Sequence, residues 1–239
     1  MQSQKFSILI PAYNEEKTIF QLLEKVVNVQ LVNGLNKEII IIDDGSKDYT
    51  RDVVKQFINN HPNENIRLIS HKINQGKGMA IRTGINAITG DFVIIQDADL
   101  ELDPMDYNPI LLKLLEGKTP VVYGSRFLDR RNRHYYKSFY YGGLAVTTIA
   151  NILFGLHLTD ESTCYKAFKT DLLRSFPLKC KGFEFCPEVT ARVARQGIRI
   201  PEVPIHYYPR SVNEGKKIRW SDGFEAIWTL IKYRFISLK

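Results

Sequence analysis

The sequence has little cysteine, and none of it is closely paired. Its 239 residues include three cysteines, Cys164, Cys180 and Cys186, with no CxxC spacing. Structural zinc sites draw mainly on cysteine thiolates, and so few thiols make a zinc site unexpected. An odd number of cysteines in a chain without a signal peptide indicates reduced thiols in a cytosolic compartment. We interpret Cys164 and Cys186 as small apolar core residues.

Several common functional motifs are also absent. The five histidines have no HExxH spacing, and no segment fits the GxxxxGK[ST] pattern of a P-loop. We therefore assign no role to the histidines. No run of Lys and Arg resembles a nucleic-acid-binding arm, and no nucleic acid partner is expected.

Positive charge is scarce in the first half of the chain and abundant in the second. Residues 1–123 contain 13 Lys and Arg and 16 Asp and Glu, a net charge of −3, whereas residues 124–239 contain 20 and 10, a net charge of +10. A basic surface attracts anionic lipid or phosphorylated small molecules, and charge alone does not choose between them.

One segment lacks charged residues altogether. Residues 138–159 read SFYYGGLAVTTIANILFGLHLT, which is long enough to cross a bilayer. Its Tyr, Thr, Asn and His residues and three glycines instead favour a buried or interfacial helix. Because no linker, repeat or low-complexity segment divides the chain, we predict one domain over residues 1–239.

Short apolar segments rich in β-branched residues alternate with segments of helical period. The expected strands read FSILIP, EIIIIDD, IRLIS, DFVIIQD and PVVYGS. Strands that are apolar on both faces are typical of an α/β fold with a mostly parallel sheet between helices. A basic, partly amphipathic C-terminal extension follows. The expected helices cover residues 15–29, 48–60, 77–88, 105–116, 138–159, 184–196 and 222–235.

Polar residues follow four of the expected strands. These segments are IPAYNEE, IIDDGSKD, ISHKINQGKG and IIQDADLE. In open parallel sheets, ligands bind outside the carboxyl ends of the strands. We therefore expect the functional site at this edge of the sheet.

The most acidic segment is IIQDADLELDP, residues 94–104. Asp97, Asp99, Glu101 and Asp103 follow a strand that should be buried, and such carboxylates repel one another unless a positive charge lies among them. We interpret Asp97 and Asp99 as ligands of Mg²⁺ or Mn²⁺. Asp103 precedes a proline and is expected to be the N-cap of the next helix.

The other polar segments carry weaker signals. Asp43 and Asp44 can accept hydrogen bonds from a base or a ribose. In the same segment, Ser46 or Asp48 can instead begin a helix. Lys77, in NQGKG at a helix start, suits a phosphate group.

Six motifs occur in order along the chain: PAYNEE, IDDGS, NQGKG, DADLE, YGSRF and EVPIHYYPR. In this order they resemble the family 2 glycosyltransferases with the GT-A fold, and among these the polyprenyl-phosphate (dolichol-phosphate) glycosyltransferases. The resemblance covers roughly residues 5–220. It implies a hexosyltransferase of glycan or cell-envelope biosynthesis that uses a nucleotide diphosphate sugar, either UDP- or GDP-linked.

For residues 1–123, the resemblance implies the donor site. Asp97 and Asp99 match the DXD pair that holds a divalent ion against the diphosphate. Glu101, where relatives often have Gln, is expected to complete the coordination, and Lys77 falls near the phosphates. The residues expected to surround the nucleotide are Pro11, Tyr13, Glu15, Asp43 and Asp44.

For residues 124–239, the resemblance implies an acceptor site close to a membrane. Arg126 matches an arginine that binds the acceptor phosphate, and Arg133 and Ser138 match a segment entering an interfacial helix. Arg210 resembles the start of a segment that closes over the site, in which Lys216 replaces the usual Ser and leaves the acceptor contacts open. The residues expected to act directly in the transfer are Asp99, Arg126, Arg210 and Lys217.

The resemblance also implies a single displacement with inversion at the anomeric carbon. A phosphate acceptor is largely anionic at neutral pH and needs no strong base. A hydroxyl acceptor would need one, and Asp160, Glu161 and Glu188 are the candidates, although each can equally form a structural cap or ion pair. Transfer to a glycan or protein, and a non-catalytic sugar-nucleotide-binding module, are the alternative functions.

Basic and aromatic residues lie beside one another over residues 130–141. This pattern suits a lipid headgroup interface, so we expect a peripheral location at the cytoplasmic face of a membrane, with polyprenyl phosphate as acceptor. The alternative is that these aromatics pack on the domain itself, on a second copy of the chain or on a membrane-protein partner.

Overall fold

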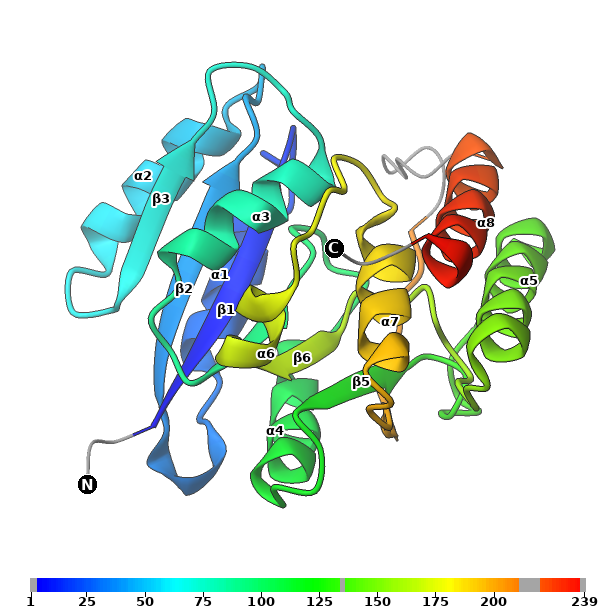
Figure 1. Ribbon diagram of the computed structural model, residues 1–239. Helices are drawn as coiled ribbons and strands as arrows, with labels where there is room; N and C mark the ends of the chain where they lie inside the picture. The colour runs from blue at the N-terminus through cyan, green and yellow to red at the C-terminus, as the bar shows by residue number, and fades with distance from the viewer. Residues whose placement is uncertain (1–3, 134–135, 211–219, 237–239) are drawn as a thin grey trace.

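The computed structural model describes residues 4–133, 136–210 and 220–236, which Figure 1 shows as a sheet between helices. The sheet has seven strands in the order β3-β2-β1-β4-β6-β5-β7. β6 pairs antiparallel with β4 and β5, and the other pairings are parallel, so the predicted mostly parallel α/β fold is confirmed. The strands are β1 (Lys5–Ala12), β2 (Asn36–Asp43), β3 (Ile66–Ser70), β4 (Phe92–Ile95), β5 (Val121–Ser125), β6 (Lys166–Lys169) and β7 (Glu202–Pro204).

The five strands expected from the sequence are all present. Residues 39–42 of β2 and all of β4 are buried, as expected for strands covered on both faces. The sequence does not predict β6 or β7, because four and three residues are too few to show a period. The helices are α1 (Ile19–Asn28), α2 (Thr50–Asn60), α3 (Lys77–Ala87), α4 (Tyr107–Leu115), α5 (Lys137–Phe154), α6 (Thr170–Ser175), α7 (Phe185–Arg195) and α8 (Trp220–Phe235).

The helices α1 and α4 begin later than expected. α1 begins at Ile19, because Asn14 has a positive φ of 50° and Glu15 accepts the Ile19 N–H in a turn. A short 3₁₀ turn, η2 (Pro104–Asp106), precedes α4. Its first N–H groups include that of Met105, which donates to Asp103 Oδ1 at 3.0 Å. The predicted cap at Asp103 is therefore confirmed.

The C-terminal helix α8 packs against α5 and α7, as Figure 1 shows at its right-hand side. Phe139 of α5 stacks on Trp220 with ring centroids 6.2 Å apart, and Tyr233 Oη donates to Glu188 at 2.8 Å. Within the described part of the chain, no helix combines the length and apolarity that crossing a membrane requires.

Candidate active site

A cleft of about 870 Å³ opens at the carboxyl ends of β1, β2 and β4 and extends to α5 and α8. The sheet brings these strand ends together, because Ala12 is in register with Asp43 and the N–H of Gln96 donates to Leu9 O. Eleven predicted site residues line the cleft: Pro11, Tyr13, Glu15, Asp44, Lys77, Asp97, Asp99, Glu101, Arg126, Ser138 and Arg210.

Lys77 and Asp97 form an ion pair in this cleft. Lys77 Nζ lies 2.5 Å from Asp97 Oδ1 and 3.4 Å from Cys164 Sγ. Burial disfavours both charges, but their mutual attraction outweighs it, so the pKa of Lys77 is well above its usual value and that of Asp97 is lowered. The loop before Lys77 needs glycine: Gly76 has a φ of 96°, and a Cβ there would lie 2.3 Å from Lys181 O.

Asp99 and Arg210 form a second ion pair. Arg210 Nη2 lies 2.5 Å from Asp99 Oδ2, and Nη1 lies 3.4 Å from Glu15 Oε2. The Arg210 backbone N–H donates to Glu101 Oε1 at 2.8 Å. Burial raises the pKa of Asp99 to about 7, and repulsion by Asp97 adds to this effect while Arg210 opposes it. The repulsion among the acidic residues is thus partly offset by two basic side chains.

Asp97 and Asp99 supply the oxygen donors that Mg²⁺ and Mn²⁺ prefer. Burial and, after it, repulsion by Asp97 raise the pKa of Asp99, and a bound cation would favour the charged form of this carboxylate. Across residues 4–133, 136–210 and 220–236, no three Asp, Glu, His or Cys side chains converge as a ready-made metal site. The two aspartates fit an ion that takes its other ligands from a diphosphate and water. The role of Glu101 as a further ligand stays a prediction.

Asp44 holds the loop that leads to α3. Its carboxylate accepts the backbone N–H groups of Gln75 at 3.0 Å and Gly76 at 2.7 Å, and His71 Nδ1 lies 2.6 Å from Oδ1. His71 Nε2 lies 2.9 Å from the Thr83 hydroxyl, so the imidazole bridges this loop and α3. The sequence gives no signal for His71, since a single histidine without a spaced partner is usually structural.

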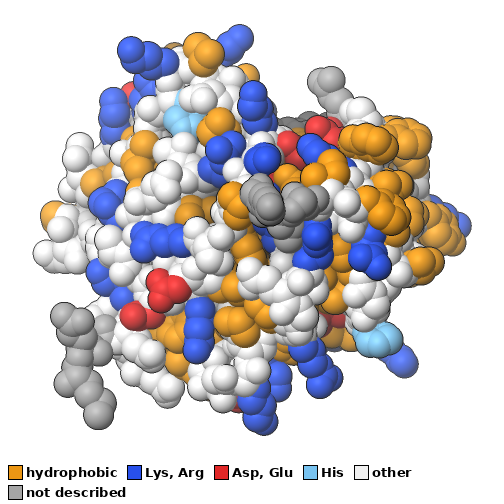
Figure 2. All heavy atoms as spheres, in the orientation of Figure 1, with side chains coloured by type: hydrophobic (Ala, Val, Ile, Leu, Met, Phe, Trp, Pro, Cys, Tyr) orange, Lys and Arg blue, Asp and Glu red, His pale blue; other side chains and the backbone are white. Residues whose placement is uncertain are grey.

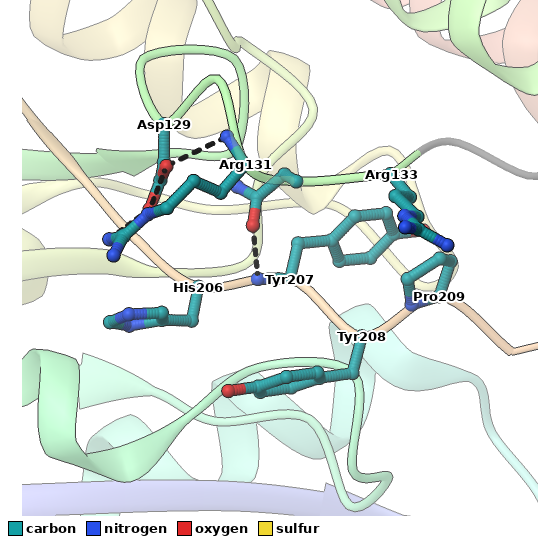
Figure 3. Close-up of a pocket in the computed structure, with 8 residues that line it drawn as sticks. Asp129, Arg131, Arg133, His206, Tyr207, Tyr208 and Pro209 are labelled. Carbon is teal, nitrogen blue, oxygen red and sulfur yellow. Dashed lines mark hydrogen bonds and ion pairs between the residues drawn. The ribbon is translucent and has the colours of Figure 1, made fainter.

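Three predicted site residues do not line this cleft. Asp43 is fully buried. Arg133 is exposed and lines a neighbouring cavity of about 390 Å³. Figure 3 shows Arg133 on one side of that cavity and the Asp129–Arg131 ion pair on the other. Lys217 lies outside the described residues.

Arg126 is held by a buried aspartate. Its Nε and Nη2 donate to the two carboxylate oxygens of Asp160 at 2.7 Å and 2.8 Å. Its guanidinium lies 5.2 Å from the ring centroid of Tyr207. Burial opposes the charge of Arg126, but Asp160 outweighs burial and raises the pKa of the guanidinium. The guanidinium is therefore held in a fixed position at the cleft, and Asp160 compensates its charge.

Two of the three candidate bases are engaged in ion pairs. Asp160 binds Arg126, and Glu188 lies 2.7 Å from Arg192 Nη2. Glu161 differs: burial raises its pKa, and its Oε1 has no hydrogen-bond partner among the residues that the structure describes. Asp160 and Glu188 therefore form ion pairs, which is the structural role given above as the alternative to acting as a base.

The structure adds residues just before β6 and around the start of α7 to the site. Cys164 and Cys186 are buried and half-buried, respectively, and both also line the cleft. The Phe183 ring lies 5.5 Å from Lys77 Nζ. These residues lie far from the polar strand ends in sequence, so motif spacing does not reveal them.

A mostly parallel sheet with spaced aspartates and a glycine-flanked lysine at its carboxyl edge is typical of nucleotide-sugar-dependent glycosyltransferases. The profile of glycosyl transferase family 2 matches residues 7–176. The chain belongs to glycosyltransferase family 2.

Named relatives narrow the resemblance. The chain is 28% identical over 239 residues to a dolichyl-phosphate beta-glucosyltransferase of Trichomonas vaginalis, covering 95% of this chain and 72% of the relative. It is 30% identical over 252 residues to a UDP-N-acetylglucosamine--dolichyl-phosphate N-acetylglucosaminyltransferase of Methanococcus voltae, covering 97% and 96%. The predicted similarity to the dolichol-phosphate glycosyltransferases is confirmed.

Solved structures show the same fold. Glucosyl-3-phosphoglycerate synthase of Mycobacterium tuberculosis, crystallised with Mn²⁺, UDP and phosphoglyceric acid, superimposes with a TM-score of 0.72 at 22% identity. The match covers 98% of this chain and 80% of that one. At this identity the similarity establishes the GT-A fold alone.

Proposed function

We propose that this chain transfers a hexose, with inversion, from a nucleotide diphosphate sugar to a polyprenyl phosphate, with Mg²⁺ or Mn²⁺ bound at Asp97 and Asp99. The observation that carries the proposal is one cleft that joins these aspartates to apolar side chains of α5 and α8. The relatives named for dolichyl phosphate support the acceptor class, and the neighbour that binds Mn²⁺ and UDP supports the donor class.

The donor diphosphate binds beside Asp97 and Asp99. A divalent ion there would neutralise the negative charge that develops on the leaving nucleotide diphosphate. Lys77, fixed against Asp97, adds a positive charge next to the phosphates. The residues assigned to the base and ribose are Pro11, Tyr13, Glu15 and Asp44.

The acceptor phosphate binds at Arg126 and Arg210, with Lys217 as a further candidate. Arginine binds phosphate bidentately and holds it in a fixed orientation behind the anomeric carbon. With a second pKa near about 6, a phosphate monoester is already a nucleophile at neutral pH and needs no general base. Asp160 and Glu188 are held in ion pairs, so a hydroxyl acceptor would leave Glu161, which lines the cleft, as the candidate base.

The isoprenoid chain follows the apolar end of the cleft. Phe139, Val146 and Ala226 line this end, together with Gly142 and Gly143. A Cβ at either glycine would meet no atom within 4 Å. The space left by the glycines suits a flexible branched hydrocarbon. In this proposal, within a single domain, residues 1–123 hold the donor and residues 124–239 hold the acceptor.

An exposed apolar surface adjoins this end of the cleft, and we call it the α5–α8 surface. Figure 2 shows hydrophobic side chains gathered where Figure 1 draws α5 and α8, with Lys and Arg beside them. Apolar patches of this kind flanked by basic residues are typical of membrane-binding surfaces. We assign it to peripheral binding at the cytoplasmic face of a membrane. Its residues are Tyr141, Ile152, Trp220, Phe224, Trp228, Phe235 and Ile236.

A transfer assay tests the proposal. UDP- and GDP-hexoses are supplied one at a time with Mn²⁺ and either a polyprenyl phosphate or a simple sugar acceptor. We expect a glycosylated lipid phosphate from one donor class and no transfer to the sugar. Transfer to the sugar instead would reassign the acceptor to a hydroxyl group. Donor binding without turnover on any acceptor would identify a non-catalytic binding module or a membrane scaffold.

A further inference from the structure

The guanidinium of Arg210 lies among the acidic side chains of the donor site. It is 14% exposed, and its Nη2 lies 2.5 Å from Asp99 Oδ2. Nη1 lies 3.4 Å from Glu15 Oε2, and Nε lies 3.8 Å from Glu101 Oε1. A divalent ion binds a carboxylate oxygen at about 2.0–2.3 Å. Such an ion on Asp99 would repel a guanidinium held at the same carboxylate.

Arg210 is held less completely than Lys77, the other basic residue that is paired with the DXD aspartates. Its Nε is buried and has no hydrogen-bond partner within the described ranges, and its contacts with Glu15 are at the long limit of a hydrogen bond. Lys77, in contrast, contacts Asp97 at 2.5 Å and is also covered by the Phe183 ring. Of the two cations, Arg210 is therefore the one that an incoming ion displaces more easily.

We propose that Arg210 is an internal counter-cation of Asp99, which competes with the divalent metal and is displaced when the metal binds. The inference rests on the proposed function for the identity of the metal site. It deepens that function, because the displaced guanidinium becomes available to the acceptor phosphate. Arg126 is already neutralised by Asp160. Full phosphate binding therefore follows metal and donor binding, which gives the two substrates a fixed order.

The first test measures Mn²⁺ binding to the chain without nucleotide, from the paramagnetic resonance signal of free Mn²⁺. Arg210→Gln removes the competing charge and keeps a polar side chain of similar length. We expect its dissociation constant for Mn²⁺ to be about tenfold lower than that of the wild-type chain. Arg210→Lys keeps the charge on a less extensive donor group and is expected to bind Mn²⁺ with intermediate affinity.

The matched control is Arg131→Gln. Arg131 forms an ion pair with Asp129 at 2.8 Å and does not contact Asp97 or Asp99. Removing the Arg131 charge should therefore leave the Mn²⁺ affinity unchanged. Mn²⁺ binding by Arg210→Gln that is equal to or weaker than that of the wild-type chain would overturn the proposed competition between Arg210 and the metal. Thermal unfolding checks that Arg210→Gln is folded. If Arg210→Gln is unfolded, the Mn²⁺ affinity of Arg210→Lys is compared with that of the wild-type chain instead.

The order of binding supplies a second test that does not depend on turnover. Calorimetry with farnesyl phosphate and the wild-type chain should show at least about tenfold tighter binding in the presence of Mn²⁺ and UDP or GDP. Equal affinity with and without them would overturn the order. If the chain transfers sugar but Arg210→Gln does not bind Mn²⁺ more tightly, only the competition between Arg210 and the metal is rejected. An inactive chain with tighter Mn²⁺ binding in Arg210→Gln rejects only the proposed function.

Discussion

At the scale of single residues, the cleft keeps carboxylates where they reduce stability. Asp97 and Asp99 are close enough to repel each other, and Lys77 and Arg210 form ion pairs with them. Burial and, after it, this repulsion raise the pKa of Asp99 to about 7. Titratable groups with strongly shifted pKa values gather at functional sites. Removing one of these charges should therefore affect activity and folding in opposite directions.

Asp99→Asn tests that separation. The change removes a charged metal ligand and relieves repulsion, so turnover should fall at least about 100-fold while the melting temperature stays equal or rises. Initial rates at saturating Mn²⁺ and thermal unfolding provide the two measurements. Asp103→Ala is the control, because it removes a helix cap and should reduce stability by about 1 kcal/mol with turnover retained. Unchanged turnover in Asp99→Asn would remove Asp99 from the metal site.

The raised pKa of Asp99 also predicts a pH dependence of stability. Burial and the neighbouring Asp97 make the folded protein bind this proton more tightly than the unfolded chain does. Its contribution is therefore most favourable below about pH 4 and is lost as the pH rises towards 7, by an amount on the order of 4 kcal/mol. Urea unfolding without metal at pH 5 and pH 7.5 should show a larger loss for the wild type than for Asp99→Asn. Parallel losses in the two proteins would contradict this.

At the scale of helices and strands, local pattern predicts most of the fold. Unbroken apolar segments such as those of β2 and β4 identify strands covered on both sides, and polar strand ends identify the edge that carries the site. β6 is missed because it is short, and because its position between β4 and β5 depends on long-range pairing. That strand follows Cys164, which contacts Lys77, so part of the cleft is also missed.

The loop before α3 is predicted to tolerate no side chain at Gly76. Gly76→Ala combines a φ of 96° with a Cβ only 2.3 Å from Lys181 O, so it should destabilise the protein by about 2–4 kcal/mol. Gly117→Ala is the matched control: its φ is 72°, but a Cβ there would meet nothing within 4 Å, and it should cost about 1 kcal/mol. Urea unfolding compares the two. Equal costs would show that the close approach to Lys181 does not constrain the loop.

The α5–α8 surface is predicted to bind anionic membranes. Phe224 and Trp228 are 73% and 64% exposed, and the double change Phe224→Ser with Trp228→Ser should reduce co-sedimentation with anionic vesicles at least about tenfold. Leu112→Ser, on the exposed face of α4, should leave vesicle binding unchanged. Vesicle binding that is unaffected by the double change would assign this surface to a second copy of the chain or to a membrane-protein partner.

At the scale of the whole molecule, an acidic half and a basic half meet at one cleft. Motif order predicts which residues gather at the carboxyl edge of the sheet, because these residues follow directly from strand ends. It does not predict the partners of Arg126 and Arg210, since Asp160 and Asp99 lie 34 and 111 residues away from them in sequence. The Arg210–Asp99 pairing arises from packing between the halves and the Arg126–Asp160 pairing from packing within the second half, and no local pattern encodes either.

The central claim is that Asp97 and Asp99 bind a divalent ion together with a nucleotide diphosphate at this edge of the sheet. Crystals grown with Mn²⁺ and either UDP or GDP, measured at the manganese absorption edge, test it most directly. We predict an anomalous peak within about 2.0–2.3 Å of carboxylate oxygens of these aspartates and of the diphosphate, with Arg210 moved away from Asp99. A nucleotide bound outside the cleft, or a manganese peak remote from both aspartates, would contradict the account.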